Sequence, residues 1–168
     1  MLKLFLTVLF GLCLSFLPAG TLNPTPAALA ASATVGAPEG VATFSENVFG
    51  EIDRYLGSIP RGYYTVMKVD ALKSLIQRES ALLVDVREPA EYAAGHIAGA
   101  INIPLRTLTQ NLDRIPQNRP AVLYCATGYR SAMGVMALQM LGYKNVRGFP
   151  PSVQGWKAAG EPLERGKA

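Results

Sequence analysis

A regular alternation of short apolar runs with helical segments constrains this chain more than any other feature, and it begins at Tyr63. The apolar runs, which we expect to be strands, cover residues 64–69, 81–86, 100–103, 121–124 and 144–146. Apolar spacings and capping residues predict helices over 70–77, 88–94, 106–113 and 131–141. Strands separated by helices in this way predict an α/β fold, with a parallel five-stranded sheet and helices on both faces.

The chain has room for one domain. Its 168 residues are an ordinary domain size, which excludes a multi-domain enzyme or a long repeat array. Hydrophobic residues make up 49% of the chain and the mean hydropathy is +0.19, so the chain is too apolar to be disordered. Much of the apolar excess lies in residues 1–33, where Lys3 is the only charged residue.

Residues 1–33 have the organisation of a secretory signal peptide. Lys3 precedes an apolar run over residues 4–17, and a stretch rich in Pro and Ala follows. A membrane-spanning helix needs about 20 apolar residues, and Pro18 ends this run earlier. We therefore expect a cleaved signal and export to a periplasm, a lumen or the extracellular space. An uncleaved signal that anchors the protein in a membrane is the alternative.

Cleavage changes what the cysteines can do. We expect the mature chain to begin near Ala31 or Thr34, so that Cys13 is removed and Cys125 remains alone. An exported protein with a single cysteine cannot form an internal disulfide. A lone thiol in an oxidising compartment is buried and inert, paired with another chain, or kept for its reactivity. The basic residues of the mature chain are scattered, which argues against a nucleic-acid partner.

Residues 34–62 separate the signal from the alternating region. The stretch 34–43 is rich in Gly, Ala and Pro, and we expect it to be a linker. Apolar residues then recur at helical spacing over 48–59, with Ser45 as a plausible N-cap. We interpret this helix as an extension packed on the domain. Docking of a protein partner through residues 44–60 is the alternative.

The loop after the strand at 121–124 carries the candidate chemistry. It reads Cys125-Ala126-Thr127-Gly128-Tyr129-Arg130. Ligands of parallel α/β sheets bind at the carboxyl ends of strands, and Cys125 directly follows one. The unpaired backbone N–H groups of such a strand-to-helix turn converge into an anion-binding nest, which the thiol sulfur can occupy.

Three effects favour the ionised form of this thiol. Backbone N–H groups donate to the sulfur, the following helix presents its positive end, and the Arg130 guanidinium lies at the far lip of the loop. Together they predict a thiol pKa below ~8.5. Gly128 supplies the backbone freedom that the tight curl needs. A nucleophilic thiolate beside an arginine is suited to attacking anions.

Four motifs in this order resemble those of single-domain rhodaneses. They are DVREPAEY at 85–92, GHIAGAINIP at 95–104, the cysteine loop with Ser131 behind it, and GWKAAG at 155–160. The resemblance extends from about residue 64 to 163, and it implies the open parallel sheet of that family within a rhodanese domain over 63–165. Tyrosine phosphatases also use a Cys-to-Arg cradle, but theirs has five intervening residues where this loop has four.

The resemblance implies sulfur transfer through a persulfide. Cys125 would take a sulfane sulfur from thiosulfate or a persulfide and pass it to a thiol or cyanide acceptor. Arg130 would orient an anionic donor. The expected substrate-binding residues, most of them acting through main-chain N–H groups, are Ala126, Thr127, Gly128, Tyr129 and Arg130, and the supporting residues are Asp85, Arg87 and Ser131. No metal or cofactor is implied.

Some of these residues also have purely structural interpretations. We expect Asp85 and Arg87 mainly to brace one another or the active loop, and His96 to make a capping or core hydrogen bond. Tyr129 lies inside the cradle, where it could take part in selecting the donor or acceptor. Core packing is the simplest interpretation of Trp156, Met133, Met136 and Met140. The alternative for the whole domain is a non-catalytic module that binds a partner or senses redox state through Cys125.

Overall fold

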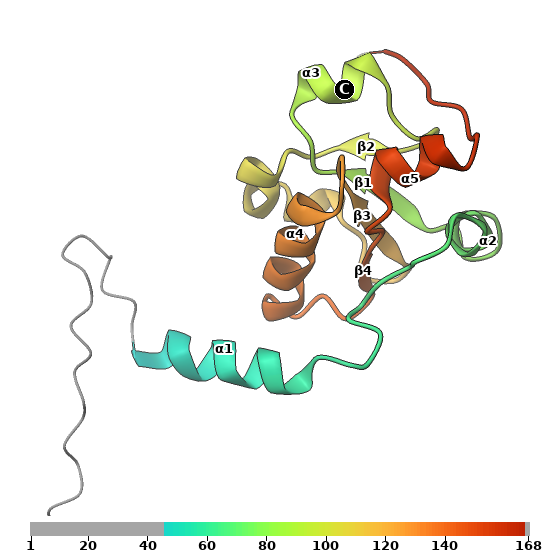
Figure 1. Cartoon of the computed structure of the whole chain (residues 1–168). Helices are drawn as coiled ribbons and strands as arrows, with labels where there is room; N and C mark the ends of the chain where they lie inside the picture. The colour runs from blue at the N-terminus through green and yellow to red at the C-terminus, as the bar shows by residue number, and fades with distance from the viewer. Residues whose placement is uncertain (1–45, 167–168) are drawn as a thin grey trace, which may run out of the picture. The chain divides into compact units, whose positions relative to one another are not determined.

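A computed structural model describes residues 46–166 of the chain (Figure 1). The expected signal peptide, the linker and Ser45 lie outside the described residues. Helices and strands follow one another as α1 (Glu46–Ser58), α2 (Val69–Glu79), β1 (Leu82–Asp85), α3 (Pro89–Ala94), β2 (Ile101–Asn102), the 3₁₀ helices η1 (Leu105–Gln110) and η2 (Leu112–Arg114), β3 (Ala121–Tyr124), α4 (Tyr129–Met140), β4 (Val146–Gly148) and α5 (Ser152–Ala158). None of the helices in this part of the chain is both long and apolar enough to cross a bilayer.

The described strands form one parallel sheet in the order β2-β1-β3-β4. β1 and β3 lie in the centre, and β3 is buried along its whole length. Val84 of β1 pairs with Leu123 of β3, and Leu123 pairs in turn with Gly148 of β4. The predicted α/β class and parallel sheet are therefore confirmed, and the carboxyl end of β3 opens directly into the cysteine loop.

Within residues 46–166 the sheet has four strands, so the expected count of five was wrong. The segment predicted as a strand over 64–69 makes a single bridge, from Thr65 to Gly148. Two features keep it from extending along β4. Tyr63 and Tyr64 both have backbone φ angles near +50° (50° and 53°), which turn the chain immediately before the bridge. Helix α2 then begins at Val69, before a longer ladder can form.

Helices cover both faces of the sheet (Figure 1). Side chains alternate along β3, so each face of the sheet carries apolar residues that a helix can cover. Val122 and Tyr124 point to one face, where α2, α3 and α5 contribute to the core; Leu123 and Cys125 point to the other, which packs on α4. Gly134 lets α4 approach closely, since a Cβ there would lie 2.7 Å from a methyl carbon of Leu123. The cysteine therefore lies on the α4 face of the sheet.

The methionines of α4 do not form its buried face. Met133 is 64% exposed and Met140 is 38% exposed, so the expectation of core packing was wrong for both, whereas Trp156 is buried as expected. The helix instead buries Ser131, Gly134, Val135 and Leu138. Apolar residues lie all round this helix, so periodicity could not identify the side that meets the sheet.

The segment predicted as a helix over 106–113 is two short 3₁₀ turns. Thr107 donates its backbone N–H to the carbonyl of Pro104, three residues back, and Asn111 bonds Leu108 in the same way. Helix α1 contacts α4, and the ring of Tyr55 on α1 stacks on Tyr64 with 6.5 Å between ring centroids. The helical extension thus packs on the domain.

Candidate active site

The thiol of Cys125 lies at the bottom of the loop that joins β3 to α4. Its residue is 1% exposed, and the backbone N–H of Gly128 donates to the sulfur at 3.1 Å. Burial raises the pKa of this thiol, but the backbone N–H groups of Ser131, Thr127 and Gly128, together with the side chain of Ser152, lower it by more in total. The net result is a thiol pKa below its ordinary value, so the loop favours the thiolate.

Gly128 shapes this cradle. Its backbone has a φ of +102°, and a Cβ added there would lie 2.9 Å from the carbonyl oxygen of Pro150. Only a residue without a side chain fits both conditions. The hydroxyl of Ser131 donates to the Gly128 carbonyl at 2.9 Å and lies 3.9 Å from the sulfur. The predicted supporting residue Ser131 therefore contacts both the loop and the thiol.

Ser152 is a site residue that the sequence analysis missed. It is fully buried at the start of α5, where its Oγ accepts a hydrogen bond from the Cys125 backbone N–H at 3.2 Å. Its own hydroxyl donates to the carbonyl of Phe149 at 2.9 Å, and the Oγ lies 3.9 Å from the sulfur. When the hydroxyl donates to the sulfur instead of to Phe149, it lowers the thiol pKa further. The backbone of Ser152 has a φ of +53°, which no sequence signal indicates for a serine.

The first turn of α5 also holds the loop from outside. The backbone N–H of Val153 donates to the Cys125 carbonyl at 3.1 Å, and that of Gln154 donates to the Ala126 carbonyl at 3.2 Å. The N–H groups at the start of a helix have no partner within the helix, so they are available for such contacts. The loop is therefore fixed on one side by α4 and on the other by α5.

Arg130 does not stand free at the lip of the loop. Its Nη1 and Nη2 donate to the two carboxylate oxygens of Glu91 at 2.6 and 2.8 Å. This bidentate pair lowers the pKa of Glu91 to about 2, with hydrogen bonding to Arg130 as the largest cause, and it raises the pKa of Arg130. The negative charge of the Cys125 thiolate also raises the Arg130 pKa, though by less than Glu91 does.

Glu91 was missed as a site residue although it belongs to the DVREPAEY motif. Its carboxylate also accepts the backbone N–H of Glu88 at 3.2 Å, as part of a capping box at the start of α3. Glutamate is favoured at the third position of a helix, so the capping pattern alone accounts for this residue. Nothing in the sequence indicates that it also contacts Arg130. Only the contact across the sheet end reveals its second partner.

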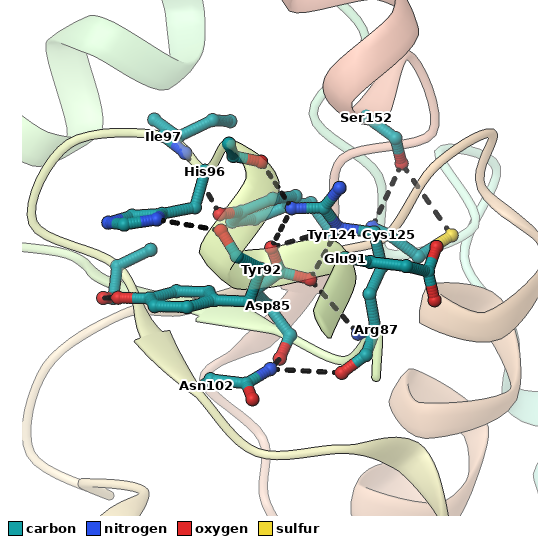
Figure 2. A network of polar contacts seen from close by, with 12 residues as sticks. Asp85, Arg87, Glu91, Tyr92, His96, Ile97, Asn102, Tyr124, Cys125 and Ser152 are labelled. Carbon is teal, nitrogen blue, oxygen red and sulfur yellow. Dashed lines mark hydrogen bonds and ion pairs between the residues drawn. The ribbon is translucent and has the colours of Figure 1, made fainter. Parts of the chain in front are cut away.

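Asp85 and Arg87 form a buried ion pair behind the loop (Figure 2). Arg87 Nε and Nη2 contact the Asp85 carboxylate at 2.9 and 2.6 Å, and Nη2 also donates to the Gly95 carbonyl at 2.7 Å. Asn102 donates its side-chain amide to the backbone carbonyls of both Asp85 and Arg87 at 2.9 Å. This network joins the ends of β1 and β2, and its charges are matched internally.

Tyr124 and His96 belong to the same network. The buried Tyr124 hydroxyl accepts the backbone N–H of Ile97 at 3.1 Å, and burial raises the pKa of this phenol. His96 stacks on Tyr92 with 3.7 Å between ring centroids, and its Nδ1 lies 3.0 Å from the Tyr92 carbonyl oxygen. His96 therefore makes a core hydrogen bond, as its setting suggested.

The remaining loop residues lie toward solvent. Tyr129 is 84% exposed and Thr127 is exposed, whereas Ala126 is half-buried. Ala126 and Thr127 border a shallow hollow that also has Lys157 in its lining. Selection of donor or acceptor by Tyr129 stays a prediction. Within residues 46–166 no group of three or more side chains is arranged to hold a metal ion.

The arrangement can stabilise negative charge on a sulfur. A thiolate at the end of β3 receives N–H and O–H groups from the loop, α4 and α5, and an ion-paired arginine lies beside it. Such a thiolate is a nucleophile. The same donors can stabilise a second sulfur atom attached to the first, provided that atom also carries negative charge.

The sequence matches the family described as Rhodanese-like domain over residues 68–159. A sulfurtransferase of Allochromatium vinosum is 35% identical over 102 residues, which cover 58% of this chain and 94% of that protein. The thiosulfate sulfurtransferase GlpE of Tolumonas auensis is 28% identical, with 56% of this chain and 89% of GlpE covered. The structure of the human single-domain sulfurtransferase TSTD1 has a TM-score of 0.50 and 30% identity, and covers 56% of this chain and 95% of TSTD1.

Proposed function

Because the chain belongs to the rhodanese-like domain family, we propose that it is a sulfurtransferase whose Cys125 carries a sulfane sulfur as a persulfide. The single observation that carries the proposal is the N–H cradle around the sulfur, with Gly128 N at 3.1 Å and a thiol pKa below its ordinary value. A cysteine kept only for packing needs no such donors. This arrangement supports a nucleophilic role.

In the first half-reaction the Cys125 thiolate attacks the outer sulfur of the donor. With thiosulfate a new S–S bond forms on Cys125, the bond between the two sulfur atoms of thiosulfate breaks, and sulfite leaves with the electron pair. No outside oxidant or reductant is needed, because the sulfane sulfur is transferred at its own oxidation level. The cradle N–H groups stabilise the resulting persulfide anion, and Arg130 attracts the donor.

In the second half-reaction an acceptor attacks the outer sulfur of the persulfide. A thiolate acceptor becomes a persulfide, cyanide becomes thiocyanate, and the electron pair of the broken S–S bond returns to Cys125 as thiolate. The name of the GlpE relative supports thiosulfate as a donor to test first. Helix α1 lies outside the residues matched to the family, and its docking of a protein partner stays part of the proposal.

Intact mass measurement of the domain after incubation with thiosulfate tests the proposal. We expect the protein to gain one sulfur atom, with one sulfite released for each protein loaded, and cyanide to remove that sulfur as thiocyanate. Cys125→Ser should gain none, and Ser131→Ala, which keeps the nucleophile, serves as the comparison for a change within the cradle. Failure to load sulfur from thiosulfate or any persulfide would contradict the proposal.

The burial of Cys125 favours a second candidate, a binding module with an unreactive thiol. Alkylation by iodoacetamide across a pH series distinguishes the two. A sulfurtransferase thiolate should react with an inflection below the ordinary thiol pKa, as the cradle predicts. An unreactive buried thiol should react slowly at every pH, with no such inflection.

We also propose that the protein acts after export, on the basis of the apolar leader over residues 1–33. Sequencing of the N-terminus of the protein from its native host tests this. A start near Ala31 or Thr34 supports cleavage, whereas Met1 or Leu2 in the exported protein would contradict it.

A further inference from the structure

We propose that Glu91 sets the charge of the sulfur donor, so that the site favours a persulfide with one negative charge over the thiosulfate dianion. The inference rests on the sulfur-transfer function proposed above and concerns the same site. It begins from the bidentate contact between Glu91 and Arg130, with both N···O distances below 3 Å at 2.6 and 2.8 Å. Arg130 is the charge that would otherwise attract an anionic donor.

The contact occupies part of the guanidinium. One N–H of Nη1 and one of Nη2 point at the Glu91 carboxylate, which leaves the remaining N–H groups of the guanidinium for a ligand. A dianion that binds Arg130 through two hydrogen bonds must therefore displace the Glu91 carboxylate, which already accepts two. A donor that needs only one contact does not compete with Glu91.

Glu91 is held in place from both sides. It occupies the third position of helix α3, where its carboxylate also accepts the backbone N–H of Glu88 at 3.2 Å. Its side chain is 38% exposed, yet its pKa of about 2 keeps it ionised at any working pH. The negative charge beside Arg130 is therefore permanent, and the helix that carries it is fixed by its own cap.

The charges near the sulfur then leave no excess of positive charge. The Cys125 thiolate and Glu91 are negative and Arg130 is positive, while the Asp85–Arg87 pair behind them is internally matched. Lys157 lines a hollow on the outer side of the loop and is the same in every variant compared below. A dianion meets twice the repulsion that a monoanion meets from this arrangement.

The chemistry of a persulfide donor suits the same charges. The Cys125 thiolate attacks the outer sulfur of the donor persulfide, the donor S–S bond breaks, and the donor leaves as a thiolate with the electron pair. The leaving group carries one negative charge, whereas thiosulfate releases the sulfite dianion past Glu91. The donor therefore approaches, and the leaving group departs, more easily when each carries one negative charge instead of two.

The test compares two neutralising substitutions on one helix. Glu91→Gln removes the charge but keeps a side-chain oxygen that can accept the Glu88 N–H, so the helix cap is retained. Glu88→Gln removes an equal charge from an exposed residue that pairs with Arg106 at 3.4 Å, and serves as the control. Each protein is loaded with thiosulfate or with the persulfide of 2-mercaptoethanol, and the rate of sulfur gain on Cys125 is followed by intact mass.

We expect Glu91→Gln to increase the loading rate from thiosulfate relative to the 2-mercaptoethanol persulfide by roughly tenfold, because the dianion gains most from the lost repulsion. Glu88→Gln should change that ratio by less than about twofold, since screening weakens more exposed charges. A Glu91→Gln variant that changes both rates equally, or that loads thiosulfate more slowly, would overturn the inference.

A binding measurement separates this inference from the proposed function. Calorimetric titration of thiosulfate into Cys125→Ser and into Cys125→Ser/Glu91→Gln reports anion affinity without sulfur transfer, and we expect roughly tenfold tighter binding in the double variant. If that tightening occurs but wild-type protein loads no sulfur, the proposed function fails and the charge assignment of Glu91 stands. If wild-type protein loads sulfur but neither affinity nor the rate ratio responds to Glu91→Gln, the inference fails alone.

Discussion

The hydroxyl oxygen of Ser152 accepts the backbone N–H of Cys125 at 3.2 Å and lies 3.9 Å from its sulfur. The serine makes this contact from a left-handed backbone conformation, with a φ of +53°. Residues other than glycine rarely adopt it, because it costs roughly 1–2 kcal/mol. Strain of this kind persists where surrounding contacts over-determine it, and it is concentrated at functional sites. Ser152 thus combines a backbone cost with direct support of the thiol.

Substitution of Ser152 should separate these two properties. Ser152→Ala and Ser152→Gly both remove the hydroxyl, so the thiol pKa should rise in both, because a contact that lowers it is lost. The unpaired Cys125 N–H should cost about 1–3 kcal/mol of unfolding free energy in each. Ser152→Gly should be the more stable of the two by up to about 1 kcal/mol, since glycine accepts the positive φ. Iodoacetamide kinetics against pH and urea denaturation measure the two effects, and an unchanged thiol pKa would contradict the first.

Gly128 and Gly142 form a matched pair for testing the cradle. Both have positive φ, of +102° and +91°, but a Cβ at Gly142 meets open space whereas one at Gly128 meets the Pro150 carbonyl oxygen at 2.9 Å. Gly142→Ala should cost about 1 kcal/mol of stability and leave the thiol pKa unchanged. Gly128→Ala should cost a further 1–3 kcal/mol or so and raise the thiol pKa, because the loop must shift. Urea denaturation and alkylation kinetics check both, and equal behaviour of the two variants would show that the clash does not matter.

The Asp85–Arg87 pair should behave as a buried ion pair. Asp85→Ala leaves the Arg87 charge buried without its partner, so we expect a loss of about 3–5 kcal/mol in unfolding free energy. Glu51→Ala in the exposed Glu51–Arg54 pair should cost no more than about 1 kcal/mol. The double variant Asp85→Ala/Arg87→Leu should recover part of the loss, because no buried charge is then left unpaired. Urea denaturation of the two single variants and the double variant tests this. A loss in the double variant equal to the sum of the losses in Asp85→Ala and Arg87→Leu would argue against it.

The Glu91–Arg130 pair gives stability a defined pH dependence. The pKa of Glu91 is about 2 in the folded protein against an ordinary value of 4.5, so its contribution is complete above about pH 4.5 and is lost as the pH falls through about 2. Wild-type protein should therefore exceed Glu91→Gln in stability at pH 7, by less than about 1 kcal/mol because the pair is partly exposed. The difference should shrink between pH 4.5 and pH 2 in urea denaturation. A difference that stays constant over that range would show that the ion pair is not its cause.

The class of fold could be predicted because its pattern is local. Strand β3 is an apolar run of four residues and α4 follows it at once, and both appear in the sequence without reference to the rest of the chain. The missing fifth strand could not be predicted in this way. Whether residues 64–69 pair along β4 depends on the positive φ angles of Tyr63 and Tyr64, which ordinary tyrosines do not signal.

The candidate site likewise has a part that the sequence predicts and a part that only the fold reveals. Cys125, Gly128 and Arg130 lie in one short loop of the sequence, so the nest around the sulfur could be predicted from that loop alone. Ser152 and Glu91 reach it from other segments, α5 and α3, and only the assembled sheet brings them there. The resulting difference is chemical: the sequence predicts a free arginine at the lip, whereas the folded chain holds an arginine already paired with a carboxylate.

Backbone pairing between His96 and Glu164 gives the segment after α5 a mechanical connection to the site. Gly95, next to His96, packs closely on Leu163, whose Cδ1 would lie 3.2 Å from a Cβ added at Gly95, and its carbonyl accepts a hydrogen bond from Nη2 of Arg87. A pull on residues 163–166, from a fused protein or an attached surface, would therefore load the Arg87 guanidinium through a single peptide unit. For anyone who immobilises or tags this protein, the end that follows α5 is the one to leave untethered.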